Sequence, residues 1–508
     1  GGVYTLALKN GENKVAVKVN NGSENPIIYN VTINRVEAVY LEMKTEPANA
    51  LVCLYTANNE RVYPENGRFK MFPGTEYTWT ASCDGYVGKT DKITLAESSV
   101  RNITLDKAAE SEKLPQLKAE YPGFRADSNN QSVINAKTPI TKESIEVKWE
   151  RQMGTSVTPS SGSTPVIVDN KVYTQSGGKL YMLDKETGEV LKSSDCFMNA
   201  GFNLIPVTYA DGMIFVPLGG GIQCFNASTL ESLWCYKGRT GACNSPIRYE
   251  NGRIYVGFQM GDFVCLTATD EDPSNQTEMK TPLWTNYSTK GYWWAGAWTN
   301  DNYVFAVDAG GALMVMDKNT GVTVQRIQTK ADKVRSDVSY YNGRIYFSTQ
   351  SGYLYSYNLA ADGKVDLDNL IEPLYYGGAS TCTPAIYNNR LYIGISGGSA
   401  FGEDGASILV ADINPENGAM SKAYLVPTKT DFGYCQTSGL IINGYEDETG
   451  YVYVYFLVNS AKGSLYMVKD KPGMTEADPE SGLFYNPSHE QYCIASAVAD
   501  SDGTIYLK

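Results

Sequence analysis

Most of the chain alternates apolar and polar residues in short runs, and this pattern repeats. Across residues 147–508, runs of about five residues are separated by Asn-Gly, Asp-Gly or Gly-Gly pairs. Such runs predict short antiparallel strands joined by tight turns. One phrase recurs clearly at residues 179–188 (KLYMLDKETG) and 313–321 (LMVMDKNTG), with weaker copies at 222–230 and 353–358. Self-similarity of this kind indicates one supersecondary unit used many times.

The Asp and Gly of the recurring phrase have a local explanation. An Asp side chain accepts hydrogen bonds from turn N–H groups, and Gly tolerates a positive φ. The spacing Asp-x-x-Thr-Gly therefore predicts a turn capped by Asp184 in one copy and by Asp317 in the other. The alternative is that one of these carboxylates contacts a ligand, although the spacing needs no ligand to explain it.

The number of repeats predicts the architecture. A second phrase precedes each copy, and it marks eight strand starts, at or near Pro165, Pro206, Pro246, Trp298, Ser339, Pro384, Gly439 and Ala497. Their mean spacing of about 45 residues is typical of four-stranded propeller blades. A single blade cannot bury both of its faces, whereas a closed ring of blades does so. We predict an all-β fold that contains an eight-bladed β-propeller.

The last repeat is shorter than the others. Residues 497–506 supply two strands, and the run at residues 145–151 (IEVKWER) predicts an outer strand without a blade of its own. We expect this N-terminal strand to complete the eighth blade and so to close the ring. One strand of that blade is still missing, so the expectation is an incomplete blade in a fragment of a longer protein.

The repeat resembles that of the pyrroloquinoline-quinone-like, or quinoprotein-type, propeller family. The shared pattern is Leu-Tyr-x-Leu-Asp-x-x-Thr-Gly followed by a Trp, and Trp234 and Trp284 follow their turns in this way, while Trp149 ends the predicted closing strand. The resemblance implies that these tryptophans dock one blade on the next. Residues 121–130 (YPGFRADSNN) resemble the segment that opens the family's propeller. The resemblance thus covers residues 121–508.

The family contains both dehydrogenases and noncatalytic proteins. Its dehydrogenases use an adjacent Cys-Cys disulfide over the quinone, carboxylate and amide ligands for calcium, and a catalytic Asp. This chain has no adjacent Cys-Cys pair, and no calcium ligands fall at matching positions. It is more similar to the propeller lipoprotein of outer-membrane barrel assembly and to propellers in surface proteins of anaerobic Gram-positive bacteria. We therefore predict no cofactor, and pyrroloquinoline quinone least of all.

One segment of the sequence leaves calcium binding as an alternative. Residues 270–278 (DEDPSNQTE) form an acidic insertion with enough oxygens to bind the ion, but without the order of an EF-hand. The alternative is a solvated loop.

The front of the chain predicts small β domains. Residues 1–36 alternate like strands and resemble the C-terminal part of a bacterial cadherin-like β-sandwich, whose remainder we expect upstream in the same polypeptide. Residues 37–106 resemble a PEGA-type surface domain, through FPGTEY at 72–77 and DGY at 84–86. Residues 107–120 are charged and Ala-rich, which is typical of a linker. Small β domains before a propeller suggest a spacer that carries a head away from a cell surface.

Composition narrows the partners and the location. The formal net charge of −13 opposes binding to nucleic acid and to anionic membrane surfaces. No apolar run of 18 residues is present, so we predict no transmembrane segment. Together with the resemblance, this favours an extracellular or cell-surface protein of a bacterium.

The cysteines are read as buried thiols, with one alternative. None of the ten forms a Cys-x-x-Cys spacing, and a buried free thiol behaves as a small apolar residue. Cys435 and Cys493 precede their inner strands by the same offset, with Cys382 close to it one blade earlier. This would gather them near one mouth of the channel, where a disulfide or a soft-metal site remains an alternative.

Candidate chemistry is sparse, and it concentrates at the predicted channel mouth. His489 is the only histidine and lies in a polar loop, so the residue type that most often serves in acid–base catalysis is scarce. Loops entering the inner strands mix amides, aromatics and charges that suit a sugar or a peptide. The candidate ligand-binding residues are Asn203, Asn244, Trp293, Trp294, Arg335, Asp337, Gln436 and Tyr492. Two alternatives are that the tryptophans pack between blades and that Arg335 pairs with Asp337 or caps a turn.

The sequence as a whole favours a noncatalytic binding or scaffold protein. Its ligand would be a glycan, a peptide or another protein, bound at the channel mouth. The alternatives are a quinoprotein-type oxidoreductase and a polysaccharide lyase or hydrolase that uses Arg335 and Asp337 in the channel.

Overall fold

The protein is all-β, as predicted, and divides into two compact units. The computed structural model describes residues 5–19, 27–111, 113–153, 163–199, 206–238, 241–331, 333–428, 434–459, 463–489 and 493–508. The two units are Gly1–Lys107 and Ala108–Lys508. Helical structure in the described residues consists of α1 (Glu446–Thr449) and two short 3-10 turns, Lys142–Ser144 and Ser399–Phe401.

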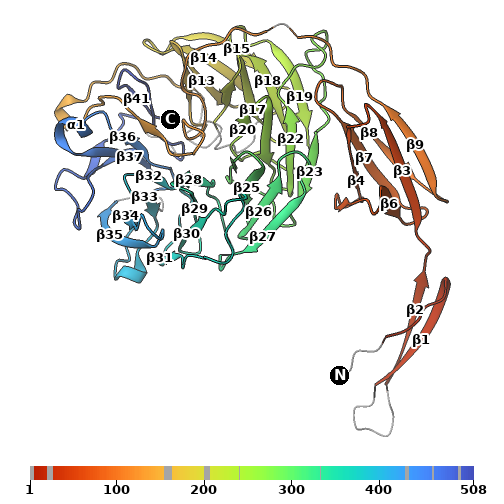
Figure 1. Ribbon diagram of the computed structural model, residues 1–508. Helices are drawn as coiled ribbons and strands as arrows, with labels where there is room; N and C mark the ends of the chain where they lie inside the picture. The colour runs from red at the N-terminus through yellow and green to blue at the C-terminus, as the bar shows by residue number, and fades with distance from the viewer. Residues whose placement is uncertain are drawn as a thin grey trace. The chain divides into compact units, whose positions relative to one another are not determined.

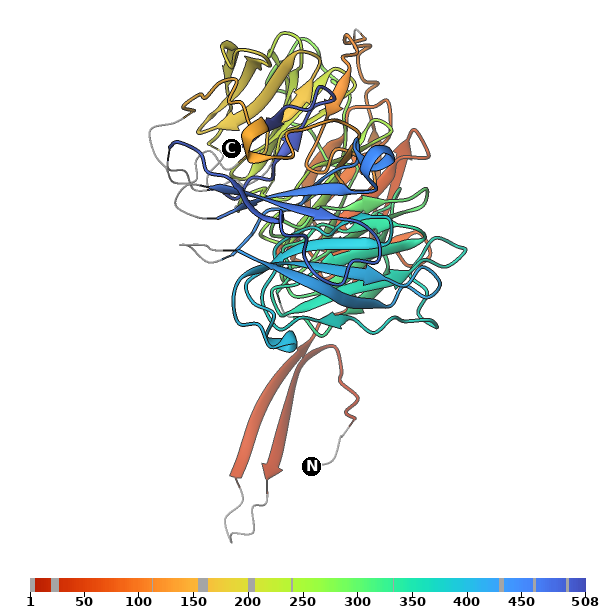
Figure 2. The ribbon, with the colours of Figure 1, turned by 90° about the vertical axis from the view of Figure 1, so that its left-hand side faces the viewer.

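The first unit contains a two-stranded ribbon and a small sandwich. Strands β1 (Gly11–Val19) and β2 (Ile27–Arg35) pair antiparallel as a long ribbon (Figure 2). The sandwich packs sheet β6-β3-β9 on sheet β5-β4-β7-β8 around one core that includes Leu41, Leu54 and Trp79. Its strands are β3 (Val39–Glu46), β4 (Leu51–Tyr55), β5 (Arg61–Val62), β6 (Arg68–Met71), β7 (Glu76–Ser82), β8 (Lys89–Thr94) and β9 (Ser99–Thr104).

The second unit is a propeller whose sheets surround a common centre (Figure 1). Its described residues form seven sheets of four or five strands and one sheet of two strands. The first sheet contains β12 (Val166–Val168), β13 (Lys171–Ser176), β14 (Lys179–Asp184) and β15 (Val190–Asp195). The second contains β16 (Thr208–Ala210), β17 (Met213–Pro217), β18 (Gly221–Asn226) and β19 (Ser232–Lys237). The third contains β20 (Arg248–Glu250), β21 (Arg253–Gly257), β22 (Asp262–Thr267) and β23 (Trp284–Tyr287).

The later sheets continue around the ring in the same order. They are β24 (Trp298–Thr299) to β27 (Thr323–Gln328) with β25 (Tyr303–Val307) and β26 (Ala312–Asp317), β28 (Ser339–Tyr341) to β31 (Leu374–Tyr375) with β29 (Arg344–Ser348) and β30 (Tyr353–Asn358), β32 (Ala385–Tyr387) to β35 (Met420–Pro427) with β33 (Arg390–Ile395) and β34 (Ser407–Ile413), β36 (Leu440–Ile442) to β39 (Gly482–Tyr485) with β37 (Val452–Val458) and β38 (Ser464–Asp470), and β40 (Val498–Ala499) with β41 (Ile505–Tyr506). Each inner strand begins at or just after a predicted start.

The recurring phrase forms the turn after the third strand of a blade. Asp184 Oδ1 accepts hydrogen bonds from the backbone N–H groups of Glu186 and Thr187, at 3.0 and 2.9 Å. Asp317 caps the corresponding turn in the same way, at 3.0 and 2.8 Å. Gly188 has a φ of 66°, in the region that favours glycine. Both carboxylates are thus occupied within their turns, which confirms the local explanation.

Tryptophans join neighbouring sheets at these turns. The indole N–H groups of Trp234 and Trp284 donate to carbonyls of the next sheet, Ala268 O at 2.9 Å and Lys318 O at 2.9 Å. Trp149, which lies outside the strands, donates in the same way to Lys185 O at 3.0 Å. A Cβ at Gly188 would lie 2.5 Å from the Trp149 ring, closer than real side chains approach. The turn glycine therefore serves the turn and also the docking of the tryptophan.

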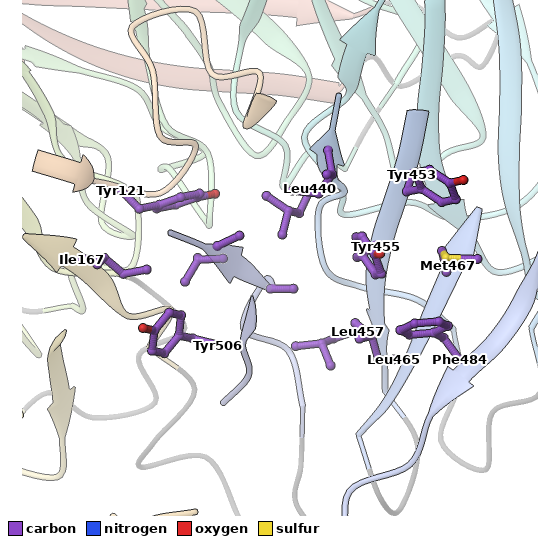
Figure 3. Packing of buried hydrophobic residues seen from close by; sticks show 14 of the residues in the cluster. Tyr121, Ile167, Leu440, Tyr453, Tyr455, Leu457, Leu465, Met467, Phe484 and Tyr506 are labelled. Atoms are coloured by element: carbon purple, nitrogen blue, oxygen red, sulfur yellow. The ribbon is translucent and has the colours of Figure 1, made fainter. Parts of the chain in front are cut away.

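The first and last sheets meet through a shared apolar core (Figure 3). It combines residues far apart in sequence, such as Ile167 on β12, Leu440 on β36 and Tyr506 on β41. Burial of these side chains supplies the hydrophobic stabilisation that closes the ring.

Residues 145–151 correct one prediction, because the structure assigns them no strand. They are held through side chains: Trp149 packs on the shared core, and Arg151 Nε donates to Gly188 O at 2.9 Å. Side-chain anchoring therefore replaces the expected backbone ladder. The described residues form only two strands in the β40–β41 sheet, so eight complete blades stay a prediction.

A segment that we call the plug, residues 121–131, crosses the inner edges of the sheets. Just before and after it, β10 (Ala119–Tyr121) pairs with β12 and β11 (Val133–Ile134) pairs with β36. Between these strands the plug bonds to several further inner strands: Pro122 O accepts from Tyr209 N at 2.7 Å, Asn130 Nδ2 donates to Val338 O at 2.8 Å, and Arg125 donates to Gly439 O at 2.8 Å. The plug thus fills one end of the channel.

Candidate functional site

Two cavities lie in the channel, and Phe124 of the plug lines both. The mouth cavity, about 30 Å³ in volume, is lined by residues that precede the inner strands, including Asn244, Trp294, Arg335, Thr381, Gln436 and Ser438. The plug cavity, about 190 Å³, lies between the plug and the inner strands β16 and β20, and Arg125, Arg248 and Asp337 contribute to its wall.

The structure brings together part of the predicted site. Asn244, Trp294, Arg335 and Gln436 line the mouth cavity, and Trp293 contacts Arg335. Asp337 lines the plug cavity instead. Asn203 and Tyr492 lie outside the described residues. The convergence follows from the repeat, because equivalent loops of different blades meet at the same end of a ring.

Arg335 lies over two indole rings. Its guanidinium carbon is 4.6 Å from the ring centroid of Trp294 and 5.3 Å from that of Trp293, within cation–π range. Burial lowers the pKa of Arg335, but an arginine remains charged in proteins. No ion pair of Arg335 is found among the residues described. The predicted alternative of a pair with Asp337 is therefore wrong.

Trp294 is held in an unusual conformation. Its φ is 55°, which is an outlier for a bulky residue, and such strain concentrates at functional sites. Its backbone N–H donates to Asn244 O at 3.1 Å, and its ring contacts Ile494. The buried indole Nε1 has no hydrogen-bond partner in the described part of the chain. Trp294 therefore holds a buried donor without a partner among the described residues, next to the mouth cavity.

The amides at the mouth are only partly used. Gln436 Oε1 accepts from Asn459 Nδ2 at 2.9 Å, and the Gln436 carbonyl accepts from Thr381 Oγ1 at 3.0 Å. Asn244 is buried, and its Oδ1 has no partner among the described residues. A buried polar atom without a partner costs about 1–3 kcal/mol, so this acceptor destabilises the mouth as the described residues form it.

Asp337 is tied to the backbone. One carboxylate oxygen accepts from Gly296 N at 2.6 Å, and a Cβ at Gly296 would lie 2.4 Å from the carboxylate. Burial raises the pKa of Asp337 to about 7, opposed by the Gly296 hydrogen bond and by the charge of Arg125. The carboxyl therefore titrates near neutral pH, next to Arg125 rather than Arg335.

The ten cysteines are free thiols, and two of them approach each other as predicted. The Sγ atoms of Cys382 and Cys435 share the carbonyl of Thr437, at 2.7 and 3.7 Å. Cys493 contacts Lys508 O at 3.2 Å instead, so the predicted group of three is not formed. Burial raises the pKa of the Cys435 thiol and, to about 12, that of Cys493.

The acidic insertion surrounds a lysine that the sequence reading missed. Lys280 is buried; its ammonium lies 3.1 Å from Glu271, donates to Thr267 O at 2.9 Å and lies 4.9 Å from the centroid of the Trp234 ring. The Glu271 carboxylate is thus engaged by the Lys280 ammonium. The described residues contain no group of three or more His, Cys, Asp or Glu side chains placed to hold a metal.

The structure agrees with the sequence prediction at His489, and it reveals a role for Arg125 that the sequence did not predict. The His489 side chain is 84% exposed, in agreement with a solvated loop. The role of Arg125 in the channel was not predicted, because its hydrogen-bond acceptor Gly439 lies just before β36, far along the chain. The only sequence signal was the resemblance of residues 121–130 to the family's opening segment.

The comparisons with known proteins agree with this architecture. Residues 140–283, which contain strands β12 to β22, match the family model described as outer membrane protein assembly factor BamB. This part of the chain is similar to the repeats of that family. The match covers less than half of the chain, and no curated protein matches the sequence significantly.

Solved structures resemble the chain at low identity. A europium-containing methanol dehydrogenase has a TM-score of 0.53 at 11% identity, covering 77% of this chain and 89% of that one. Quinohemoprotein alcohol dehydrogenase from Comamonas testosteroni has a TM-score of 0.51 at 12% identity, with 76% of each chain covered. BamB from Moraxella catarrhalis has a TM-score of 0.42 at 17% identity, covering 60% of this chain and 80% of that one. At these identities, the two dehydrogenases show the propeller fold alone.

Proposed function

We propose that this protein is a noncatalytic binding or scaffold protein that holds a glycan, a peptide or a protein ligand at the channel mouth. One observation carries the proposal. Loops of several blades bring Asn244, Trp294, Arg335 and Gln436 around one cavity, next to Phe124 of the plug.

The chemistry of the mouth favours binding over catalysis. The described residues that line its cavity offer a guanidinium, an indole, amides and hydroxyls, with no Asp, Glu or His among them. General acid–base catalysis needs a side chain that exchanges protons near the working pH. Arg335 and Asp337, which a lyase or hydrolase would have to use together, line different cavities. These groups can orient and bind a ligand without changing it.

A place in the bacterial cell envelope is part of the proposal. The family matched by residues 140–283 is described as an outer membrane protein assembly factor, which supports an envelope location and a protein partner. Among the helices that the structure describes, none has the length and apolar character to cross a bilayer. The separate β-sandwich of the first unit supports a spacer role for that part of the chain.

A quinone cofactor does not fit the mouth as the described residues form it. A cavity of about 30 Å³ holds one or two water molecules, whereas pyrroloquinoline quinone is a fused-ring molecule. No two cysteines are adjacent in the sequence, so the disulfide of the dehydrogenases has no counterpart. We derive no redox step for this protein.

An array of glycans and peptides probed with the full chain tests the proposal. We expect binding to at least one class, lost in Trp294→Ala and in Arg335→Gln, and no consumption of any compound. Arg326→Gln is the matched control, because Arg326 is an exposed arginine of β27 whose Nη2 donates to Gln328. Binding that survives both mouth substitutions, or turnover of an arrayed compound, would contradict the proposal.

A further inference from the structure

Arg335 brings a positive charge to the mouth that the described residues leave uncompensated. The chain carries a net charge of −13, yet no described carboxylate pairs with this guanidinium. Asp337, two positions away, accepts from Gly296 N and lines the plug cavity. The two indoles support the cation by their ring faces, which leaves its N–H donors for an external acceptor. A planar guanidinium suits a carboxylate, which it binds through two parallel hydrogen bonds.

Two further polar atoms beside the mouth cavity lack a hydrogen-bond partner among the described residues. Trp294 Nε1 is a buried donor without a partner among the described residues, and Asn244 Oδ1 is a buried acceptor in the same condition. Trp294 is also held at a φ of 55°, and this strain is a separate sign of function. A peptide's last residue offers a carboxylate for the Arg335 guanidinium.

The size of the mouth cavity selects among ligands. Its volume of about 30 Å³ suits a compact charged group such as a carboxylate. We propose that the mouth binds the free C-terminal carboxylate of a peptide or protein chain. This inference rests on the proposed function and names the chemical class of its ligand.

Two pools of N-terminally fluorescein-labelled random hexapeptides test the inference by fluorescence anisotropy with the full chain. One pool ends in a free carboxylate and the other in a carboxamide. We expect the free pool to bind at least about tenfold more tightly, because charge-assisted hydrogen bonds contribute about 1.5–3 kcal/mol. A labelled uronic acid tetrasaccharide, which carries carboxylates on sugar rings, should bind weakly.

Substitutions then locate the contact. Arg335→Gln should weaken binding of the free pool by about ten- to a hundredfold, and Arg335→Lys, which keeps the charge but loses the planar fork, should have an intermediate effect. Arg326→Gln should leave binding unchanged, and circular dichroism melting verifies that each variant folds.

The outcomes separate the inference from the proposed function. Equal binding of the two pools, or an Arg335→Gln variant that binds like the unsubstituted protein, overturns the inference. Tight binding of the tetrasaccharide with loss in Trp294→Ala also overturns it, while the proposed function stands. If none of the peptides or glycans binds, both fail.

Discussion

Arg125 and Arg335 both lie in the central channel, but among the described residues only Arg125 has hydrogen-bond acceptors for its guanidinium. Arg125 is 1% exposed, and its guanidinium donates to Gln131 O at 3.1 Å and Gly439 O at 2.8 Å. Arg335 lies on Trp293 and Trp294 and has no hydrogen-bond acceptor among the described residues. An arginine bound to carbonyls holds the plug in place. One supported only by ring faces keeps its donors for a ligand.

The comparison predicts the largest effect at Arg125. Arg125→Ala should lower the free energy of unfolding by about 3–5 kcal/mol, because it leaves buried carbonyls unpaired and opens space in the channel. Urea denaturation followed by tryptophan fluorescence measures this. Arg326→Ala, at an exposed position, should stay within about 0.5 kcal/mol of the unsubstituted protein. A similar loss in both variants would show that Arg125 does not anchor the plug.

Asp337 is expected to give a smaller, pH-dependent effect. Its pKa rises from an ordinary value of about 3.8 to about 7 in the folded protein, so the folded state holds its proton where the unfolded state has lost it. This contribution to stability is full below about pH 3.8 and is lost as the pH rises to about 7. Asp337→Asn should remove this pH dependence together with the cost of ionising a buried carboxyl, so the variant should be more stable than the unsubstituted protein by about 1–3 kcal/mol between pH 4 and 8.

Urea midpoints at several pH values provide the measurement for Asp337. The quantity to compare is the difference between variant and unsubstituted protein, because other carboxyl groups titrate in both. A difference that does not change with pH would show that Asp337 stays charged over this range. It would then need a stronger positive partner than Arg125.

The smallest effect on stability is expected at Arg335. Arg335→Gln should change the free energy of unfolding by less than about 1 kcal/mol, because only cation–π contacts at a partly exposed site are lost. Thermal melting in the absence of ligand measures it. Destabilisation as large as that of Arg125→Ala would make Arg335 a structural residue and remove the distinction between the two arginines.

The sequence predicted the features that depend on nearby residues. The Asp184 turn is specified by four neighbouring positions, and the strand starts follow from local alternation of apolar and polar residues. The docking of Trp149, Trp234 and Trp284 came from the family resemblance, and the structure confirms it. The closing strand at residues 145–151 was wrong, because an alternating run forms a strand only where a partner strand is in reach of its backbone.

The sequence predicted which residues of the candidate site lie at the channel mouth, but not which side chains they contact there. Asn244, Trp294, Arg335 and Gln436 converge because equivalent loops of a ring meet at one end, which the repeat alone implies. Arg335 and Asp337 line different cavities, although residues two apart in an extended segment point to the same side, so local periodicity does not predict their separation. Lys280 and the acidic insertion were read separately, since nothing local shows that a lysine will be buried among its neighbours' carboxylates.

By itself, the sequence determined that this protein is a ring of repeated β units and that any function lies in the loops where the units differ. Turn chemistry and strand periodicity are short-range properties, so they can be read along the chain. Only the tertiary structure decided which of two channel arginines is held by carbonyls and which is left open. That depends on Gly439 meeting Arg125 and on two indoles meeting Arg335, contacts made when distant segments close around one centre.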